Sequence, residues 1–384
     1  MQYVPLGKIS DHISRFGLGC MRLPQRTMED GKKEIDDDAA ITLIRTAIDE
    51  GVNYLDTAYA YGRSEEVVGK ALRDGYRQRV ILATKLPLSE KTKSKSDLQS
   101  ILDEELIRLQ TDYIDVYHLH NLHKGSWRIA QECGALEFLR EQKEKGTIRH
   151  PGFSLHERPD HLYELLDAFP WELVMMQYNY LDKYNQIGQE GLRYIAARGI
   201  PVVAMEPLHG GLLAQDVPQG VIDAFGDFHP EMNQVEKAFM WLYNQPEVSV
   251  ILSGSSSMEQ LQESLGIFAK ARTGILSEDD EKIYDRARAI WGEKVKVPCT
   301  ACQYCLPCPA GVNIPEVFRL YNEIARDANR SQRWLYGAML INSGEDATKC
   351  VMCRQCEPQC PQSIAIADRL KDAHSELQPR TGSM

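Results

Sequence analysis

Short runs of apolar and β-branched residues alternate along the chain with longer stretches whose apolar positions recur three and four residues apart. The short runs predict buried strands, and the longer stretches predict amphipathic helices. Strands are predicted at Phe16–Met21, Asn53–Thr57, Val80–Lys85, Ile114–His120, His150–Ser154, Leu173–Tyr178, Val202–Pro207 and Val248–Ser253. Helices are predicted at Asp37–Glu50, Ser64–Asp74, Lys95–Leu109, Gly134–Lys145, Pro159–Ala168, Ile187–Arg198, Met232–Asn244 and Met258–Lys270. Strands that are each followed by a helix, eight times over, predict an α/β fold of the (β/α)8 TIM-barrel type.

The end of this strand and helix alternation sets the predicted division of the chain. The predicted parts are a barrel over 1–276, a linker over 277–297, a small second domain over 298–375 and a flexible tail over 376–384. A short hairpin around Tyr3–Ile13 is expected at the start of the barrel, and a helix at Glu278–Trp291 is expected in the linker.

Eight of the ten cysteines fall in two short runs in the predicted second domain. The runs are Cys299, Cys302, Cys305, Cys308 and Cys350, Cys353, Cys356, Cys360. The second run has the C-x2-C-x2-C-x3-C-P spacing of bacterial ferredoxins that hold two [4Fe–4S] clusters, and the first run is one residue shorter before its last cysteine. The spacing therefore predicts two [4Fe–4S] clusters.

In such runs the last cysteine typically ligates the cluster held by the other run. On this pattern Cys360 joins Cys299, Cys302 and Cys305, while Cys308 joins the first three cysteines of the second run. Zinc and disulfides are the alternatives, although zinc sites usually use two separated cysteine pairs.

About forty residues separate the two cysteine runs. This spacer is predicted to form helices at Ile314–Ala328 and Ser331–Asn342, since Val317, Leu320 and Ile324 recur at helical spacing. The runs and their spacer resemble the α-helical ferredoxin domain of iron–sulfur subunits in respiratory dehydrogenases. The resemblance implies exchange of single electrons with a redox protein partner, with partner binding alone or stabilisation of the fold as the alternatives.

Composition narrows the class of partner. The 384 residues carry a net charge of −11 and no basic block, which argues against nucleic acid as a partner. No apolar run approaches the ~18 residues of a membrane span, and no signal-peptide pattern is visible. Clusters and the isolated Cys20 and Cys133 suit a reducing compartment, so we expect a cytoplasmic protein.

Polar side chains recur at the C-terminal ends of the predicted strands, where barrel enzymes place their chemistry. Asp56 and Lys85 lie at the ends of two strands. Tyr61 follows Asp56 in the next loop, and His120 ends the fourth strand. An ammonium stabilises a neighbouring phenolate, a carboxylate holds the ammonium in place, and an imidazole orients a carbonyl oxygen. The set predicts hydride transfer at a carbonyl with Tyr61 as the proton donor, without a metal.

The segments that carry these residues are Asn53–Gly62, Ala83–Lys85, Asp115–His120 and Gly152–Ser154. In order and spacing they resemble the signature motifs of the aldo/keto reductase family, over roughly residues 1–275. With the cysteine runs, the chain resembles the subgroup that carries a C-terminal ferredoxin-type domain. The resemblance implies catalytic roles for Asp56, Tyr61, Lys85 and His120, and contacts with the nicotinamide carboxamide for Ser154 and Gln177.

The resemblance also implies further cofactor contacts at Met205, Gly254, Ser255, Ser256 and Gln260. Several positions depart from the family pattern: Leu155 replaces an asparagine, and Met205 replaces an aromatic residue that stacks on nicotinamide in many members. Gly254 and Gln260 stand where many members have a lysine and an arginine that bind the 2′-phosphate of NADPH. Losing two cations weakens the preference for that phosphate, so both NADP and NAD are expected as candidate cofactors.

Three functions are consistent with these patterns. We favour an NAD(P)-dependent oxidoreductase that acts on a small carbonyl or alcohol substrate, with Leu122–Gln131 and Leu208–His229 as loops that wall its pocket. The barrel can instead be a nucleotide-binding sensor or scaffold for an electron-transfer complex. The third reading is a metal-dependent hydrolase in which His118 and His120 bind zinc with His156 or His209.

Overall fold

The computed structural model describes residues 1–29, 31, 33–89, 91–156, 159–215, 217–326 and 331–378. The chain divides into two compact units, one formed by Met1–Pro207 with Glu236–Ile275 and the other by Leu208–Val235 with Leu276–Met384. Residues 208–235 therefore group with the C-terminal part of the chain, whereas the sequence predicts them within a barrel of 1–276. Of the predicted tail, 379–384 lie outside the described residues.

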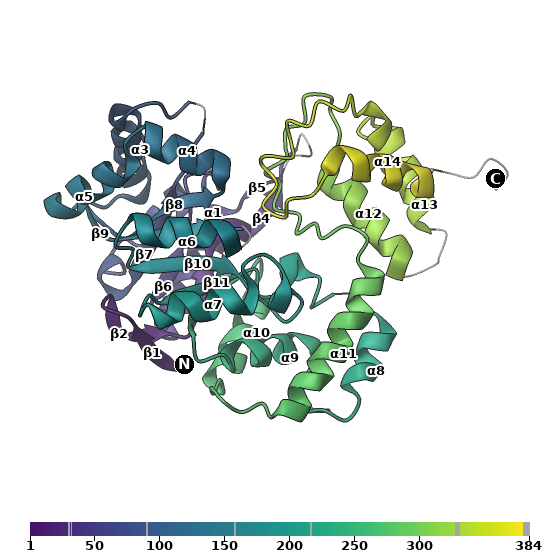
Figure 1. Cartoon of the computed structure of the whole chain (residues 1–384), viewed down its shortest axis with the longest axis horizontal. Coiled ribbons are helices and arrows are strands. Elements are labelled where there is room, and N and C mark those ends of the chain that lie inside the picture. The colour runs from purple at the N-terminus through teal and green to yellow at the C-terminus, as the bar shows by residue number, and fades with distance from the viewer. Residues whose placement is uncertain are drawn as a thin grey trace. The chain divides into compact units, whose positions relative to one another are not determined.

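The first unit contains a closed barrel of parallel strands (Figure 1). Its strands are β3 Phe16–Gly19, β6 Tyr54–Asp56, β7 Ile81–Leu86, β8 Ile114–Leu122, β9 Ile148–Leu155, β10 Leu173–Gln177, β11 Val202–Met205 and β12 Val248–Gly254. Strand β12 pairs with β3 from Ile251 opposite Phe16 to Gly254 opposite Gly19, which closes the ring. The predicted (β/α)8 barrel is confirmed, and each predicted strand matches within two residues at either end.

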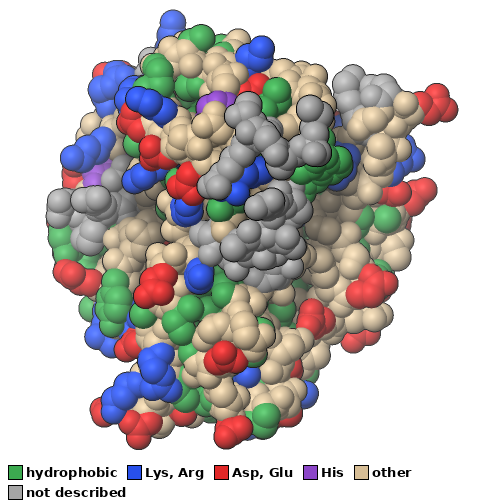
Figure 2. All heavy atoms as spheres, turned by 90° about the vertical axis from the view of Figure 1, so that its right-hand side faces the viewer, with side chains coloured by type: hydrophobic (Ala, Val, Ile, Leu, Met, Phe, Trp, Pro, Cys, Tyr) green, Lys and Arg blue, Asp and Glu red, His purple; other side chains and the backbone are tan. Residues whose placement is uncertain are grey.

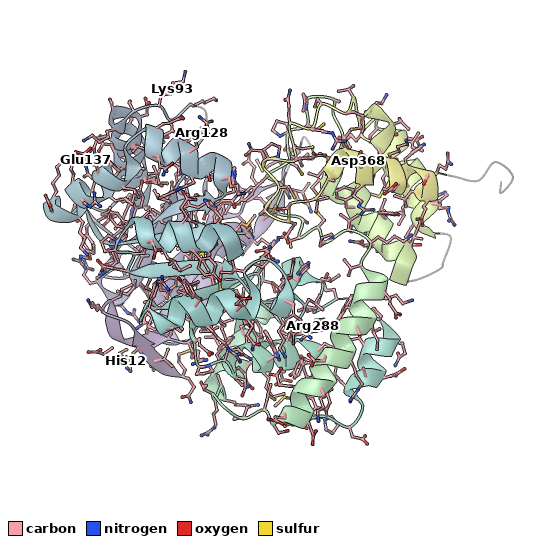
Figure 3. All side chains as sticks on the ribbon, viewed as in Figure 1. His12, Lys93, Arg128, Glu137, Arg288 and Asp368 are labelled. Carbon is pink, nitrogen blue, oxygen red and sulfur yellow. The ribbon has the colours of Figure 1, made fainter. Side chains whose placement is uncertain are left out.

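Helices surround this barrel (Figure 1). They are α1 Asp37–Asp49, α2 Ser64–Ala71, α3 Lys95–Leu109, α4 Lys124–Glu132, α5 Ala135–Lys145, α6 Pro159–Ala168, α7 Gly188–Ala197, α9 Gln234–Tyr243 and α10 Met258–Ala269. Polar side chains cap several of them: Asp36 accepts from the Ala39 N–H at 3.1 Å, and Ser257 from the Gln260 N–H at 3.4 Å. Charged side chains such as Lys93, Arg128 and Glu137 point outward (Figure 3).

The interior of the barrel is layered because alternate residues of each strand point inward. An apolar layer includes Tyr54, Ala83, Val116 and Leu173. Two residues further along β6 and β7, Asp56 and Lys85 replace the apolar side chains. The polarity therefore changes toward the C-terminal ends of the strands, where the candidate site lies.

Two antiparallel hairpins accompany the barrel. β1 Tyr3–Leu6 pairs with β2 Ser10–Ser14, which confirms the predicted N-terminal hairpin, and β4 Gln25–Thr27 pairs with β5 Lys33–Ile35. Leu6 and Ile13 of the first hairpin join the apolar layer of the barrel. The hairpin therefore shields the N-terminal end of the barrel interior from water.

The second unit is helical. It contains α8 Gln219–Phe225, α11 Glu278–Lys294, α12 Ile314–Arg326, α13 Ser331–Leu335, a π-helical stretch Tyr336–Ile341 and α14 Ile366–Leu377. Phe225 of α8 packs edge-on against Tyr284 of α11, with ring centroids 5.3 Å apart. Helices α12 and α14 share a core that includes Val317, Phe318 and Leu370, and cysteines of both runs pack against it.

Two segments predicted as loops contain helices. Helix α4 covers most of Leu122–Gln131 and ends one residue beyond it. Gly125 and Ser126, which disfavour a helix, lie in its first turn, and the His123 side chain caps its start. Helix α8 lies within Leu208–His229 and is only seven residues long, too short for periodicity to reveal. In contrast, the predicted helix at Glu278–Trp291 is present as α11.

Within the described parts of the chain, no helix has the length and apolar character needed to cross a bilayer. Lys and Arg side chains are interspersed with Asp and Glu over the face drawn in Figure 2.

Gly69 of α2 generates a test of helix packing. A Cβ at Gly69 would lie 2.4 Å from the Arg108 carbonyl oxygen at the end of α3. Gly69→Ala should therefore lower the free energy of unfolding by about 1–3 kcal/mol, because backbone must move to admit one methyl group. Urea denaturation followed by tryptophan fluorescence measures the change.

Gly266 of α10 is the matched control, since a Cβ there meets nothing within 4 Å. Gly266→Ala should raise stability by about 0.5–1 kcal/mol through helix propensity alone. Equal effects of the two substitutions would contradict the close packing of α2 on α3.

Candidate active site and cysteine centre

Three strands and one loop bring the four predicted catalytic residues together. The Lys85 ammonium, on β7, donates to an Asp56 carboxylate oxygen on β6 and to the Thr57 carbonyl oxygen at 2.8 Å. The Lys85 Nζ lies 4.8 Å from the centroid of the Tyr61 ring. The rings of Tyr61 and His120 meet nearly at right angles, with centroids 5.9 Å apart.

The loop that carries Tyr61 is held by short-range hydrogen bonds. The Tyr61 N–H donates to the Ala58 carbonyl oxygen at 3.0 Å, and the Ser64 N–H donates to the Tyr61 carbonyl oxygen at 3.1 Å. Ser64 and Thr57 join their hydroxyls at 2.9 Å, across the loop. Two consecutive turns therefore aim the Tyr61 ring toward Lys85.

Burial controls the charges in this site. The side chains of Lys85 and Asp56 are 1% and 2% exposed. Burial raises the pKa of Asp56, while the Lys85 charge opposes that rise. Burial and the same Lys85 charge lower the pKa of His120 well below its usual value. His120 is therefore a neutral imidazole at neutral pH and can offer one N–H as a donor.

His118 lies one layer deeper, opposite Lys85 in the register of β7 and β8. Gly152 leaves room for the His118 ring, because a Cβ at this position would lie 2.8 Å from His118 Nδ1. Burial lowers the pKa of His118 to about 3, and the Lys85 charge adds to this effect. The structure therefore places His118 as a neutral interior group.

The hydrolase reading receives no support from this arrangement. Among the residues that the structure describes, no three His, Cys, Asp or Glu side chains lie close enough to hold one metal ion. A catalytic zinc requires about three protein ligands around a single point. His118 itself is fully buried in the barrel interior.

The residues expected to contact nicotinamide form a buried polar network. Ser154 Oγ accepts from the Asn121 N–H at 2.8 Å. Gln177 donates to Asp182 Oδ2 at 2.7 Å, and its amide is also bonded to His156. Burial lowers the pKa of His156 to about 4, so this imidazole is also neutral at neutral pH.

Asn179 and Asp182 were missed by sequence reasoning. Asn179 Nδ2 donates to Asp182 Oδ2 at 2.6 Å and to the Glu206 carbonyl oxygen at 2.9 Å. The signal was an Asn-x-x-Asp pattern directly after β10, which reads as an ordinary turn. Because Asp182 is buried and accepts a hydrogen bond from Gln177, it holds the Gln177 amide in place.

The loop after β12 holds the other predicted cofactor residues. Gly254 is exposed, whereas Ser255 is buried and its Oγ has no hydrogen-bond partner among the residues that the structure describes. The Ser256 N–H donates to Gln260 Oε1 at 2.8 Å, and the Ser256 hydroxyl donates to the Arg22 carbonyl oxygen at 3.0 Å. Met205 ends β11 opposite Gln177 in the strand register.

Arg22 is a cation at this loop that sequence reasoning missed. Its Cβ lies 3.7 Å from the position that a Cβ would take at Gly254. Its guanidinium lies 3.7 Å from a Glu206 carboxylate oxygen. Arg22 follows β3, far from β12 in sequence, so only closure of the barrel reveals the proximity.

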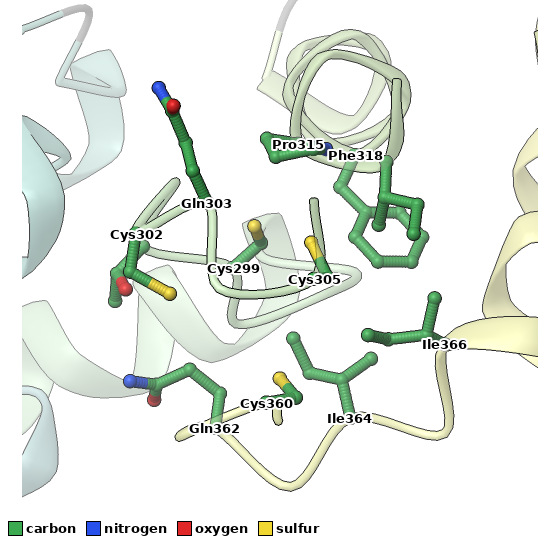
Figure 4. Close-up of a pocket in the computed structure, with 12 residues that line it drawn as sticks. Cys299, Cys302, Gln303, Cys305, Pro315, Phe318, Cys360, Gln362, Ile364 and Ile366 are labelled. Carbon is green, nitrogen blue, oxygen red and sulfur yellow. The ribbon is translucent and has the colours of Figure 1, made fainter. Parts of the chain in front are cut away.

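In the second unit, four sulfurs point into one hollow (Figure 4). They belong to Cys299, Cys302, Cys305 and Cys360, and the hollow is completed by apolar side chains including Phe318 and Ile366. Burial raises the pKa of Cys305 to about 12, and the neighbouring thiolates of Cys302, Cys299 and Cys360 add to the rise. This is the first cysteine set expected from the spacing.

The second set is also brought together. Burial raises the pKa of the Cys356 thiol to about 11, and the negative charges of Glu357, Cys308 and Cys350 add to that rise. Cys308 of the first run thus lies with cysteines of the second. The exchange of the last cysteine between two clusters, and the place of Cys353 in the second set, stay predictions.

The backbone around both sets suits anionic sulfur. Ala301 and Gln303 in the first run, and Met352 and Arg354 in the second, all have positive φ between 54° and 68°. Such left-handed residues turn successive N–H groups inward, as in many Fe–S sites. The Ala301 N–H donates to Cys299 Sγ at 3.4 Å. The chemistry of the donors and the shape of the hollow fit an iron–sulfur cluster.

Comparison with known proteins finds a family model for each of two parts of the chain. Residues 15–274 match the model of the Aldo/keto reductase family, and residues 298–365 match that of a 4Fe-4S dicluster domain. The uncharacterized oxidoreductase YqkF of Bacillus subtilis (strain 168) is 31% identical over 290 residues, which cover 68% of this chain and 89% of YqkF.

A second relative and a solved structure are similar over the same region. The NADH-specific methylglyoxal reductase of Escherichia coli (strain K12) is 27% identical over 69% of this chain and 93% of its own length. The aldo-keto reductase AKR11C1 of Bacillus halodurans, in its holo form, superposes with a TM-score of 0.62 at 30% identity, covering 75% of this chain and 96% of that one.

The buried His118 generates a prediction about pH. Its folded pKa of about 3 lies below the ordinary value of 6.5, so the unfolded chain binds more protons between these values. The stability that His118 contributes is therefore present above pH 6.5 and is lost as the pH falls toward 3. His118→Gln should reduce the loss of unfolding free energy between pH 7 and pH 5 by about 2 kcal/mol.

Urea denaturation at the two pH values measures this difference. His12→Gln, changed on the N-terminal hairpin (Figure 3), controls for the loss of a histidine as such. An unaltered pH dependence in His118→Gln would show that the ring is not held neutral by burial.

Proposed function

The chain belongs to the aldo/keto reductase family, and we propose that it transfers hydride between a nicotinamide cofactor and a small carbonyl or alcohol, with Tyr61 exchanging the proton. The observation that carries this proposal is the position of the Lys85 ammonium. It lies 4.8 Å from the Tyr61 ring centroid and is held by the Asp56 carboxylate. A positive charge so close to a phenol favours the phenolate, which makes the hydroxyl a better proton donor.

His120 orients the substrate oxygen in this proposal. Its neutral imidazole has an N–H to donate to a carbonyl oxygen, on which negative charge develops during hydride addition. Because the pKa of His120 is lowered by burial and by Lys85, it does not compete with Tyr61 as the proton donor. In this proposal the neutral His120 positions the substrate oxygen, and the Tyr61 hydroxyl protonates it.

Ser154 and Gln177 are proposed to bind the carboxamide of nicotinamide, with Met205 against its ring. Asp182 holds the Gln177 amide in one orientation, so little side-chain entropy is lost on binding. When bound, the nicotinamide supplies or accepts the hydride.

The distal part of the cofactor is proposed to lie along Gly254, Ser255, Ser256 and Gln260. The backbone amides before α10 suit a phosphate, and the unpartnered Ser255 Oγ is available as a further polar contact. Arg22 adds a cation at this loop. These groups can serve NADP or NAD, and one of the related reductases is named for NADH.

The cysteines are proposed to hold two [4Fe–4S] clusters, and the domain to exchange single electrons with a redox protein. In this proposal Cys299, Cys302, Cys305 and Cys360 hold one cluster, supported by the hollow that they line. Cys350, Cys353, Cys356 and Cys308 hold the other, supported by the proximity of Cys308 and Cys350 to Cys356. A hydride moves two electrons together, whereas a cluster moves one. The domain therefore gives the chain a second kind of electron chemistry beside the barrel.

Tyr61→Phe tests the catalytic proposal. Removing the proton donor should lower kcat about 10²- to 10⁴-fold, the usual contribution of general acid catalysis. Nucleotide affinity should stay unchanged. Oxidation of NADPH or NADH in the presence of methylglyoxal, followed at the nicotinamide absorbance band, measures the rate.

Tyr59→Phe is the matched control, because its hydroxyl donates instead to Glu104 at 2.8 Å. It should retain wild-type kcat. Retention of most activity by Tyr61→Phe would refute the proposal, and nucleotide binding without turnover by the wild-type protein would favour the scaffold reading.

The exchanged cysteine sets make a separate prediction. Cys305→Ser with Cys360→Ser should cost the protein about four iron atoms per chain, because both cysteines belong to one cluster. Cys305→Ser with Cys308→Ser should cost about eight, because these neighbours in sequence serve different clusters. Iron analysis and electron paramagnetic resonance of anaerobically purified protein distinguish the two pairs. Equal iron loss in both double variants would contradict the exchange.

A further inference from the structure

The two cysteine loops share one backbone pattern. Cys299 to Cys305 and Cys350 to Cys356 have the same spacing, and positive φ values occur at the same positions in both. Thr300 therefore corresponds to Val351, and Ala301 to Met352. Because the two backbones match, a difference in exposure between corresponding residues reflects what packs against each loop.

The first loop is covered at Thr300, whereas Ala301 and Gln303 are exposed. Thr300 is only 2% exposed. The turn His209–Gly211 of the same unit lies against it, since a Cβ at Gly210 would be 2.5 Å from the Thr300 carbonyl oxygen. The chain itself therefore closes this side of the first cysteine set.

The second loop is bare at the corresponding place. Val351 is 70% exposed and Met352 is 45% exposed, and the ligand position Cys353 that follows them is exposed as well. Val351 and Met352 are consecutive exposed apolar residues next to an accessible cysteine. They form an apolar rim through which a redox partner can approach the second cysteine set.

The charges at this rim are already compensated within the chain. Arg354 donates to both carboxylate oxygens of Asp368, at 2.9 and 3.0 Å, and to Glu357 at 3.1 Å. A guanidinium that is bound by two carboxylates offers little net charge to a partner. Docking here depends on apolar contact more than on charge.

We propose that the loop Cys350–Cys356 is the electron port of this protein, where a one-electron carrier protein docks on Val351 and Met352. This inference rests on the proposed electron exchange by the dicluster domain. The carrier would present its own redox centre at an apolar surface, in the small, transient interface usual for redox encounters. Each encounter moves one electron, with no bond made or broken: the domain is oxidised and the carrier is reduced, or the reverse.

The test uses full-length protein with its clusters in place, reduced anaerobically with dithionite and mixed rapidly with oxidised cytochrome c as a protein probe. Val351→Ser and Met352→Asn are the port variants, since asparagine tolerates the positive φ of Met352. Each should lower the second-order rate constant about tenfold, which corresponds to about 1.4 kcal/mol. Ferricyanide, a small acceptor, should oxidise these variants as fast as wild type.

Ile107→Ser is the control, because Ile107 on α3 is also an exposed β-branched residue, at 76%. Its rate with cytochrome c should equal that of wild type. Iron content and electron paramagnetic resonance check that each sample holds the same clusters as wild type. The rate comparison uses the port variants that pass this check. Wild-type rates in these variants, or an equal slowing with ferricyanide, would overturn the port. Nicotinamide is absent throughout, so failure here is separate from failure of the Tyr61 proposal.

Discussion

The buried ion pair between Lys85 and Asp56 is the interaction on which the candidate active site depends. Removing two charges from water costs several kcal/mol for each, and their attraction offsets this only when the geometry is held. The barrel holds it: Asp56 lies opposite Ala83 in the register of β6 and β7, so Lys85 reaches the same interior layer from two residues further along. The Thr57 carbonyl oxygen satisfies a further proton of the ammonium. Lys85 faces the Tyr61 ring, and its charge adds to burial in lowering the pKa of His118 and His120.

The barrel and the dicluster domain both use a rigid backbone to hold polar groups in the positions that a ligand needs. In the barrel, strands place an ion pair and the neutral imidazoles of His118 and His120 at fixed spacing. In the dicluster domain, left-handed residues such as Ala301 and Met352 turn N–H groups toward thiolates. Non-glycine residues in this conformation carry strain, which the surrounding structure must overcome.

Most of the barrel and of its candidate site could be predicted from the sequence, because each depends on short sequence patterns. Each strand is a short apolar run, and Asp56, Lys85 and His120 occur at strand ends where parallel topology forces convergence. The residues that escaped prediction depend on closure in three dimensions. Arg22 meets Gly254 only because β3 and β12 are neighbours, and Asp182 orders Gln177 from a turn that looks ordinary. Helices α4 and α8 were missed because short helices with glycine near their start leave too few periodic positions. The grouping of 208–235 with the C-terminal part depends on packing between α8 and α11, which no pattern within either segment announces.

That grouping bears on how the two units became joined. The polypeptide passes from the first unit to the second after Pro207, returns at Glu236, and leaves again after Ile275. An end-to-end fusion of two genes would give a polypeptide that passes only once from the first unit to the second. Here Phe225, inserted between consecutive barrel strands, rests on Tyr284 beyond the barrel's last helix. The insertion and the appended helix are therefore matched halves of one packing unit, and recombination that exchanged the C-terminal part alone would leave α8 without its complement.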